Sequence, residues 1–233
     1  NSSKISIIMS VQNEENNIKK AIESILNQTY TNFDFLIIDD ASDDNSLQVL
    51  KEYQRLDERI NIFKNNKNLG LTKSLNILAS NSSAPIIARQ DADDVSHPNR
   101  LSSQLNFLIN KKLDASTTKA QIMSSGQEIH KLSYFLPTRL IIKLKNPFIH
   151  GSLMIKKSVF NKLGMYDEKF YYAQDYKLFS DLIKQNFRIK ILNEILYTLN
   201  TTNNISSNFS MQQKYFADCV KKNKVPSNEN IFK

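Results

Sequence analysis

Short apolar runs alternate with amphipathic segments from the start of the chain to about residue 100. The runs have the length of buried strands, and between them apolar side chains recur every three or four residues, as on one face of a helix. The predicted elements, strand first and then alternating, are 5–9, 18–26, 35–38, 47–56, 60–63, 71–78 and 86–88. Since parallel strands need crossover helices, four strands and three helices in alternation predict a parallel sheet covered on both faces.

The alternation weakens beyond residue 100. Pro98 precedes another predicted helix that extends through Leu108, and residues 120–123 predict a further strand. Helical spacing returns at 171–185, after a segment without a clean period. From about Thr201 the chain is polar, which predicts a C-terminal tail with at most one helix, near 209–220.

The composition of the 233 residues excludes several classes of site. The four glycines are too scattered for a phosphate-binding glycine loop. The single Cys219 excludes an intrachain disulfide and a thiolate zinc site, and the three histidines, His97, His130 and His150, are too scattered for an imidazole site. A bound metal would therefore need oxygen ligands. With no run of 18 apolar residues and no leader pattern at the start, the sequence predicts a cytoplasmic protein.

Charge is divided unequally along the chain. Residues 1–100 carry 11 basic and 14 acidic side chains, whereas residues 101–233 carry 20 and 9. We expect the residues that carry the reaction to lie in the acidic part. The basic part is expected to form a surface for anionic acceptors, lipid phosphates or a membrane. A nucleic acid is not expected, because aromatic residues do not interleave with the basic ones. Residues 138–145 are either a small interfacial element or a half-buried strand or helix.

Polar side chains follow the predicted strands. In open α/β sheets ligands bind beyond the carboxyl ends of the strands. The residues at these ends are Ser10, Gln12, Asn13 and Glu14 after the first strand, Asp39 and Asp40 after the second, and Asp91, Asp93 and Asp94 after the fourth. So many carboxylates at one edge repel one another unless a cation compensates them, and a divalent metal would do so. Helix capping and turn formation are the alternative for each aspartate alone.

An ordered set of segments makes a family resemblance specific. The chain resembles the family 2 glycosyltransferases of the GT-A fold over about residues 4–200. The matching segments are 5–14, 21–30, 35–42, 68–70, 90–94, 146–152, 164–167 and 173–179.

The resemblance implies an α/β GT-A fold, with a mostly parallel central sheet flanked by helices and a Rossmann-like nucleotide-binding half. That half would be 1–97, the acceptor-binding half 98–200, and the tail 201–233. It also implies inverting transfer of a sugar from a nucleotide-sugar, commonly a UDP-sugar, with Mn²⁺ or Mg²⁺ as cofactor. The expected acceptor is a glycan or lipid-linked glycan, in assembly of a cell-surface or capsular polysaccharide or lipopolysaccharide. The protein would contact the membrane peripherally, at its inner face, through the basic C-terminal half.

Individual roles also follow from the resemblance. Ser10, Gln12, Glu14 and Asp40 would contact the nucleotide, Asp91 the ribose or the sugar, and Asp93 the metal, while Asp175 matches the catalytic base. A carboxylate opposite the diphosphate can take the proton that an attacking hydroxyl loses. The alternative for Asp175 is an N-cap of the following helix, and both roles are compatible because a helix N-terminus stabilises an ionised carboxylate.

The sequence departs from the family pattern at four positions. Gln12 stands where an aromatic residue is common, Ala41 where glycine is common, Gln174 where glutamate precedes the base, and Asp181 where a basic residue often follows. The Gln-x-x-Arg-Trp signature of processive synthases is absent, which favours addition of one sugar per encounter.

The main alternative to a transferase is a degenerate module that binds nucleotide without sugar transfer. A receiver domain would leave the region around Asp175 unexplained, and a nucleotidyltransferase would need a glycine-rich basic loop after the first strand.

Overall fold

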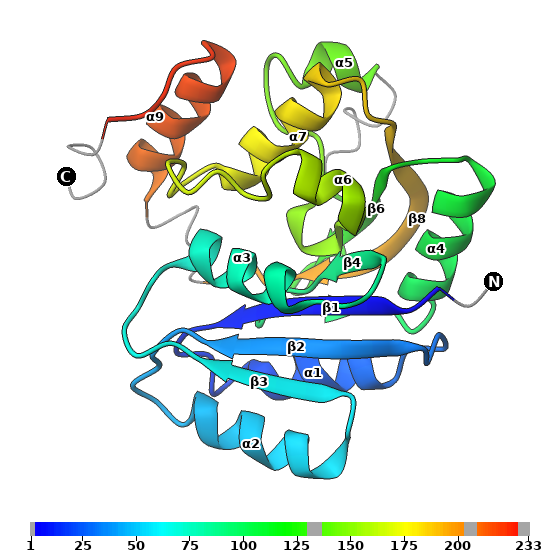
Figure 1. Cartoon of the computed structure of the whole chain (residues 1–233), viewed down its shortest axis with the longest axis vertical. Helices are drawn as coiled ribbons and strands as arrows, with labels where there is room; N and C mark the ends of the chain where they lie inside the picture. The colour runs from blue at the N-terminus through cyan, green and yellow to red at the C-terminus, as the bar shows by residue number, and fades with distance from the viewer. Residues whose placement is uncertain (1–2, 130–136, 203–208, 228–233) are drawn as a thin grey trace.

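The computed structural model describes residues 3–129, 137–202 and 209–227, which form one eight-stranded sheet flanked by helices (Figure 1). The strands are β1 Ile5–Val11, β2 Phe33–Asp39, β3 Ile60–Lys64, β4 Ile86–Arg89, β5 Val95–Ser96, β6 Ala115–Ile122, β7 Met154–Lys156 and β8 Ile189–Leu199. The helices are α1 Ile18–Leu26, α2 Ser46–Leu56, α3 Leu71–Asn81, α4 Arg100–Asn110, α5 Thr138–Ile141, α6 Lys157–Lys162, α7 Gln174–Lys184 and α9 Ser210–Lys221, with a 3₁₀ turn at His150–Ser152. The sheet order is β3-β2-β1-β4-β7-β6-β8-β5.

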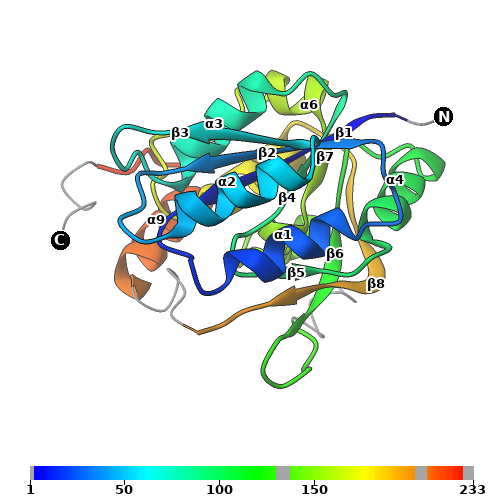
Figure 2. The ribbon, with the colours of Figure 1, turned by 90° about the horizontal axis from the view of Figure 1, so that it is seen from below.

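The first half is the predicted doubly covered parallel sheet. β1 pairs in parallel with β2 and β4, and β2 with β3. Successive side chains of a strand point to opposite faces, so Ile37 packs with α1 and α2 while Ile38 packs with α3. Figures 1 and 2 show α1 and α2 on one face of these strands and α3 on the other. The expected α/β class, with a central sheet flanked by helices, is confirmed.

The second half of the sheet is mixed. β7 pairs antiparallel with β4 and β6, β8 pairs in parallel with β6, and β5 is antiparallel to β8. β6 begins at Ala115, five residues before the predicted strand. The sequence pattern did not indicate this first part, because Ser116, Thr117 and Thr118 are polar although they are fully buried. β8 was not predicted from the sequence, because its buried and exposed residues follow no strict alternation.

The C-terminal segment contributes a packed helix. α9 covers most of the segment in which a helix was expected, and its Phe216 is fully buried in the core on the α3 face. This core also includes Phe179 and Leu182 of α7, next to α9 in Figure 1. Within residues 3–129, 137–202 and 209–227, no helix has the length and apolar character that a membrane crossing requires.

Ala41, at the position where glycine is common in the family, has a φ of +58°. An L-residue in this left-handed region costs about 1–2 kcal/mol, a penalty that glycine does not have. We therefore expect Ala41→Gly to raise the free energy of unfolding by about 1 kcal/mol in urea denaturation. The matched control is Ala217→Gly within α9, which should lower that free energy by about 0.5–1 kcal/mol. A stability loss for Ala41→Gly would contradict the assigned backbone conformation.

Candidate active site

The loops that follow β1 and β2 are joined by side-chain hydrogen bonds to backbone groups. The backbone N–H groups of Asn13 and Glu14 donate to the hydroxyls of Ser42 (3.1 Å) and Ser46 (2.8 Å). In return the Asn13 side-chain oxygen accepts from the backbone N–H of Asp43 at 2.8 Å. These bonds place Glu14 and Asp40, 26 positions apart in sequence, at the same edge of the sheet.

Asp40 is only 2% exposed, and its carboxylate already organises a loop. Its Oδ1 accepts from the Asn65 side chain (2.7 Å) and from the Leu69 backbone (2.8 Å), while Oδ2 accepts from the Gly70 backbone (2.8 Å). Gly70 has a φ of +83°, and a Cβ there would lie 2.8 Å from the Tyr171 ring. Asp40 thus stands at the predicted edge and shapes it. Its contact with a nucleotide stays a prediction.

Gln90 holds the Asp91–Asp94 turn after β4. Its side-chain amide donates to the backbone oxygens of Asp91 (3.0 Å) and Asp94 (2.9 Å), and its side-chain oxygen accepts from the Ser96 hydroxyl at 2.6 Å. Asp94 is 2% exposed, and its Oδ1 accepts from the Asn200 backbone at 2.8 Å. Burial, followed by the charges of Asp91 and Asp93, raises the pKa of Asp94. Asp94 is therefore a structural member of the turn, whereas Asp91 and Asp93 remain half-buried.

Arg89, the last residue of β4, forms a bidentate ion pair with Asp91. Its Nη1 donates to Asp91 Oδ2 at 2.8 Å and its Nη2 to Oδ1. The Arg89 side chain is only 3% exposed, so the half-buried Asp91 supplies the counter-charge for a buried guanidinium. The Asp91 backbone N–H donates to the Tyr197 hydroxyl of β8 at 3.1 Å. A Cβ at Gly151 would lie 2.2 Å from that hydroxyl and 2.7 Å from Asp91 Oδ2, so only glycine fits there.

Asp93 and Glu14 are the half-buried carboxylates of this edge that have raised pKa values. Burial, then the charges of Asp91 and Glu14, raises the pKa of Asp93 to about 7. Burial is also the main reason for the raised pKa of Glu14. Within the described ranges, no cation forms an ion pair with Asp93. The site is therefore a set of oxygen ligands with excess negative charge, which suits a hard divalent cation.

A complete protein cage for a metal is not formed. Among the residues that the structure describes, no three His, Cys, Asp or Glu side chains are grouped so that they could hold an ion. Mg²⁺ is commonly bound through one or two carboxylates together with substrate phosphates and water, so a single Asp93 fits that chemistry.

Asp175 lies in the first turn of α7. Its Oδ2 accepts from the Asn146 side chain at 2.7 Å, and Ala173, which precedes the helix, has a φ of +54°. Burial raises the pKa of Asp175, while the Tyr176 backbone N–H, Asn146 and the charge of Arg89 lower it. A carboxylate with a raised pKa is better suited to take up a proton near neutral pH than an exposed one.

Two groups, Arg89 and Tyr166, connect Asp175 with the turn after β4. The charge of Arg89 acts on both Asp91 and Asp175, and both carboxylates act on the buried hydroxyl of Tyr166. Ser10 lies half-buried at the end of β1, and Gln12 is exposed just beyond it. The structure therefore brings the residues proposed for the donor side to one edge and places Asp175 within electrostatic reach of them.

Several residues of this region were not assigned from the sequence. Arg89 and Gln90 are charged and polar residues at the end of a buried strand, and that unusual placement is the signal that could have identified them. Tyr197 lies on β8, a strand that the sequence pattern did not indicate, so no signal identified it. His150 begins the 3₁₀ turn and lies beside Tyr166. Its Nε2 is 2.7 Å from the Tyr166 hydroxyl, and burial lowers its pKa well below 6.5, so it is a neutral structural residue.

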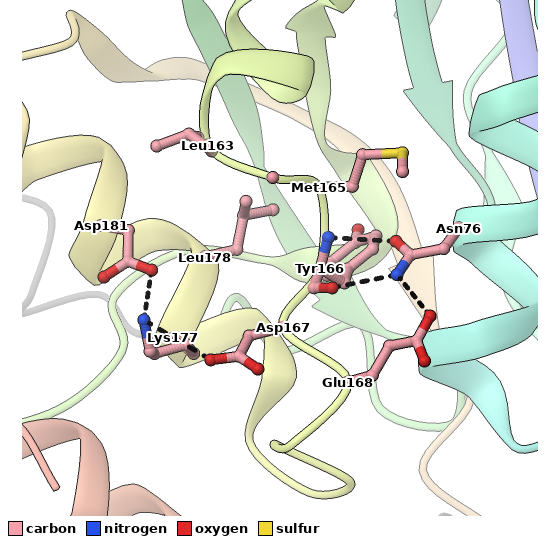
Figure 3. Close-up of a pocket in the computed structure, with 10 residues that line it drawn as sticks. Asn76, Leu163, Met165, Tyr166, Asp167, Glu168, Lys177, Leu178 and Asp181 are labelled. Carbon is pink, nitrogen blue, oxygen red and sulfur yellow. Dashed lines mark hydrogen bonds and ion pairs between the residues drawn. The ribbon is translucent and has the colours of Figure 1, made fainter. Parts of the chain in front are cut away.

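A separate cavity of about 370 Å³ lies between α3, the loop after α6, and α7 (Figure 3). The Asn76 side chain donates to the Tyr166 carbonyl oxygen at 2.9 Å and accepts from its N–H at 3.0 Å. On α7, Lys177 forms ion pairs with Asp181 and, at 3.9 Å, with Asp167. Asp181, at the position where the family often has a basic residue, is thus neutralised within its own helix.

Comparison with known proteins gives the family. Residues 6–164 match the family model described as glycosyl transferase family 2. The chain belongs to this family. It is 32% identical over 222 residues to an uncharacterized glycosyltransferase of Methanocaldococcus jannaschii, covering 91% of this chain and 76% of the relative. It is 34% identical over 199 residues to the O-antigen biosynthesis glycosyltransferase WbnJ of Escherichia coli, covering 82% and 77%. The putative glycosyltransferase EpsE of Bacillus subtilis is 32% identical over 205 residues, covering 83% and 72%.

Solved structures share the fold of this glycosyltransferase. TarS of S. aureus in complex with UDP superposes with a TM-score of 0.76 at 18% identity, covering 94% of this chain and 64% of that one. The mannosyltransferase PcManGT of Pyrobaculum calidifontis, in complex with GDP-Man and Mn²⁺, gives a TM-score of 0.77 at 14% identity, covering 97% and 66%. These structures confirm the expected GT-A fold. The family model and the relatives confirm the glycosyltransferase activity expected from the sequence at the level of the family.

Proposed function

We propose that this glycosyltransferase transfers one sugar at a time, with inversion, from a UDP-sugar to a hydroxyl of a surface-glycan acceptor. The observation that carries the proposal is the placement of Asp175 near the Arg89–Asp91 pair, with Asp93 and Glu14 at the same edge. Relatives named for O-antigen and teichuronic acid biosynthesis support a surface polysaccharide as the product. The UDP complex of TarS supports the choice of nucleotide.

The donor would lie beyond the carboxyl ends of β1, β2 and β4, where ligands bind in such sheets. Ser10, Gln12, Glu14 and Asp40 would contact its nucleotide, and Asp91 the ribose or the sugar. Asp93 would hold Mn²⁺ or Mg²⁺, and the ion, when bound, would neutralise the diphosphate as a Lewis acid. The GDP-Man and Mn²⁺ complex of PcManGT supports a divalent ion in this fold.

Asp175 would accept the proton of the acceptor hydroxyl. The hydroxyl oxygen forms the new bond to the anomeric carbon while the bond from that carbon to the diphosphate oxygen breaks. UDP leaves with the electron pair of the broken bond, and attack from the opposite side inverts the anomeric carbon. Asn146 keeps the carboxylate oriented through its 2.7 Å hydrogen bond.

A screen for nucleotide release tests the proposal. UDP-sugars and GDP-sugars are incubated with candidate glycan acceptors, with and without Mn²⁺, and the released nucleoside diphosphate is measured. We expect release from a UDP-sugar that depends on the ion. Release of GDP alone would change the donor, and UDP binding without any release would identify the degenerate binding module instead.

Removal of the proposed metal ligand should weaken UDP binding only when the ion is present. We expect Asp93→Ala to reduce UDP affinity in Mn²⁺ by about tenfold, about 1.4 kcal/mol, measured by calorimetry. In EDTA the variant and the unchanged protein should bind UDP equally. Asp43→Ala, an exposed aspartate in the loop after β2, is the control and should behave as the unchanged protein. Equal loss of affinity in Mn²⁺ and in EDTA would contradict the metal role.

We also propose peripheral contact with the inner face of a membrane through the segment around α5. Leu140 and Leu144 are 60% and 74% exposed, and the exposed Lys143 and Lys145 stand beside them. Apolar side chains among basic ones suit an anionic bilayer surface. Ile141 and Ile142 are buried, so this segment is anchored to the domain by its other face.

Vesicle flotation tests this contact. The protein should float with vesicles of phosphatidylglycerol and phosphatidylcholine, and Leu140→Ser with Leu144→Ser should reduce the bound fraction several-fold. Leu56→Ser is the control, since Leu56 is 80% exposed on α2, in the other half of the chain. Equal flotation of the double variant would contradict the contact.

A further inference from the structure

A second cavity, of about 310 Å³, opens beside the proposed base. Asp175 itself is part of its wall, together with Asn146, which donates to the Asp175 carboxylate at 2.7 Å. The described residues that line it are Leu144, Lys145, Asn146, Ala173, Asp175 and Tyr176 on one side, and Gln213, Lys214, Ala217 and Lys221 of α9 on the other. A molecule in this cavity would therefore touch the group that we propose as proton acceptor.

Three lysines face this cavity from two separate segments. Lys145 follows α5, whereas Lys214 and Lys221 share one face of α9, as their spacing of seven residues requires. Lys221 forms an ion pair with Asp218 at 3.2 Å. Within residues 3–129, 137–202 and 209–227, no ion pair engages Lys145 or Lys214. Asp175 is the one acidic side chain among the described lining residues. The α9 wall is therefore positive, Lys145 adds a positive charge on the opposite wall, and Asp175 is the negative group.

We propose that this cavity binds the acceptor, and that the acceptor carries a phosphate or carboxylate group near the hydroxyl that attacks. The statement that the ligand is an acceptor rests on the proposed function. Lysine ammonium groups attract such anions, while the Asp175 carboxylate repels them, so the anion lies toward α9 and the hydroxyl toward the base. The amides of Asn146 and Gln213 can bond sugar hydroxyls, and the Tyr176 ring offers an apolar surface.

Three small probes of matched structure test the charge preference: glucose 1-phosphate, glucuronate and glucose. Binding is followed through the backbone amide signals of ¹⁵N-labelled protein, in EDTA so that no divalent ion holds a phosphate at the acidic edge. The test variant is Lys145→Ala with Lys214→Ala. The control is Lys51→Ala with Lys111→Ala, which removes two exposed lysines of α2 and the end of α4 and so the same net charge.

We expect at least one charged probe to bind about tenfold more tightly than glucose, with shifts at Asn146, Gln213 and their neighbours. The test variant should lose most of this preference and the control should keep it. The anionic probe that binds more tightly identifies the group on the acceptor as phosphate or carboxylate. Equal binding of the three probes, shifts elsewhere, or an unchanged preference in the test variant would overturn the inference.

Calorimetry with UDP and Mn²⁺ on the same three proteins separates this inference from the proposed function. All three should bind UDP equally, because the lysines lie on the acceptor side. Failure of UDP to bind the unchanged protein would count against the proposed donor site, whereas loss of the charge preference alone would count only against the anionic acceptor.

Discussion

Asp175→Asn should lower kcat for sugar transfer by about 10²–10⁴-fold while leaving UDP affinity unchanged. The amide keeps the size of the side chain and can still accept a hydrogen bond from Asn146, but it cannot take up a proton. The loss therefore falls on the chemical step and not on donor binding. UDP release under saturating donor and calorimetry with UDP are the two measurements that check it.

The matched control for this variant is Asp181→Asn, on the same helix. Asp181 is paired with Lys177 near the other cavity, so its change should affect kcat less than about threefold. If Asp175→Asn keeps a kcat within fivefold of the unchanged protein, Asp175 is not the base. If it loses UDP affinity as well, its role is structural.

Asp91→Asn should destabilise the fold by about 3–5 kcal/mol, because it leaves the buried Arg89 without its counter-charge. The Arg89 side chain is 3% exposed and that of Asp91 27% exposed, so the arginine has less access to water as a substitute. Urea denaturation, with the midpoint and slope fitted together, measures the change. The proposed contact of Asp91 with ribose does not enter this measurement, since no donor is present.

A double-mutant cycle identifies the cause of that loss. Arg89→Met together with Asp91→Asn removes both charges, and we expect most of the stability to return, since an apolar side chain can replace a buried ion pair. Serious destabilisation that persists in the double variant would mean that Asp91 acts mainly through its other contacts, near Tyr197 and Gly151.

The parallel half of the fold could be predicted because its signal is local. Apolar runs such as Ile5–Met9 and the helical spacing of 18–26 each reflect burial that one element needs by itself. The strands of the second half gave weaker signals. After Ala115, β6 continues with the buried polar residues Ser116–Thr118, and some of their hydrogen bonds reach distant segments, as when Ser152 Oγ accepts from the Thr118 backbone at 3.0 Å.

The candidate site, too, could be predicted from the sequence only in part. Strand ends and the family pattern predict that Glu14, Asp40, Asp91, Asp93 and Asp175 belong to one site. Their roles at that site stay predictions. The sequence could not show that the Asp40 carboxylate accepts hydrogen bonds from the backbone N–H groups of Leu69 and Gly70. The tertiary fold alone brings these donors to Asp40.

By itself, then, the sequence determined the class of the fold, the family, and which carboxylates follow which strands, because these depend on residue type and order. Only the tertiary structure decided which charges meet. Arg89 becomes the partner of Asp91, Gly151 is confined by Tyr197 and Asp91, and lysines of α9 come to face Asp175. The physical reason is that Coulomb interactions and steric contact depend on distance through space, and residues far apart in sequence reach that distance only when the sheet and its helices have packed.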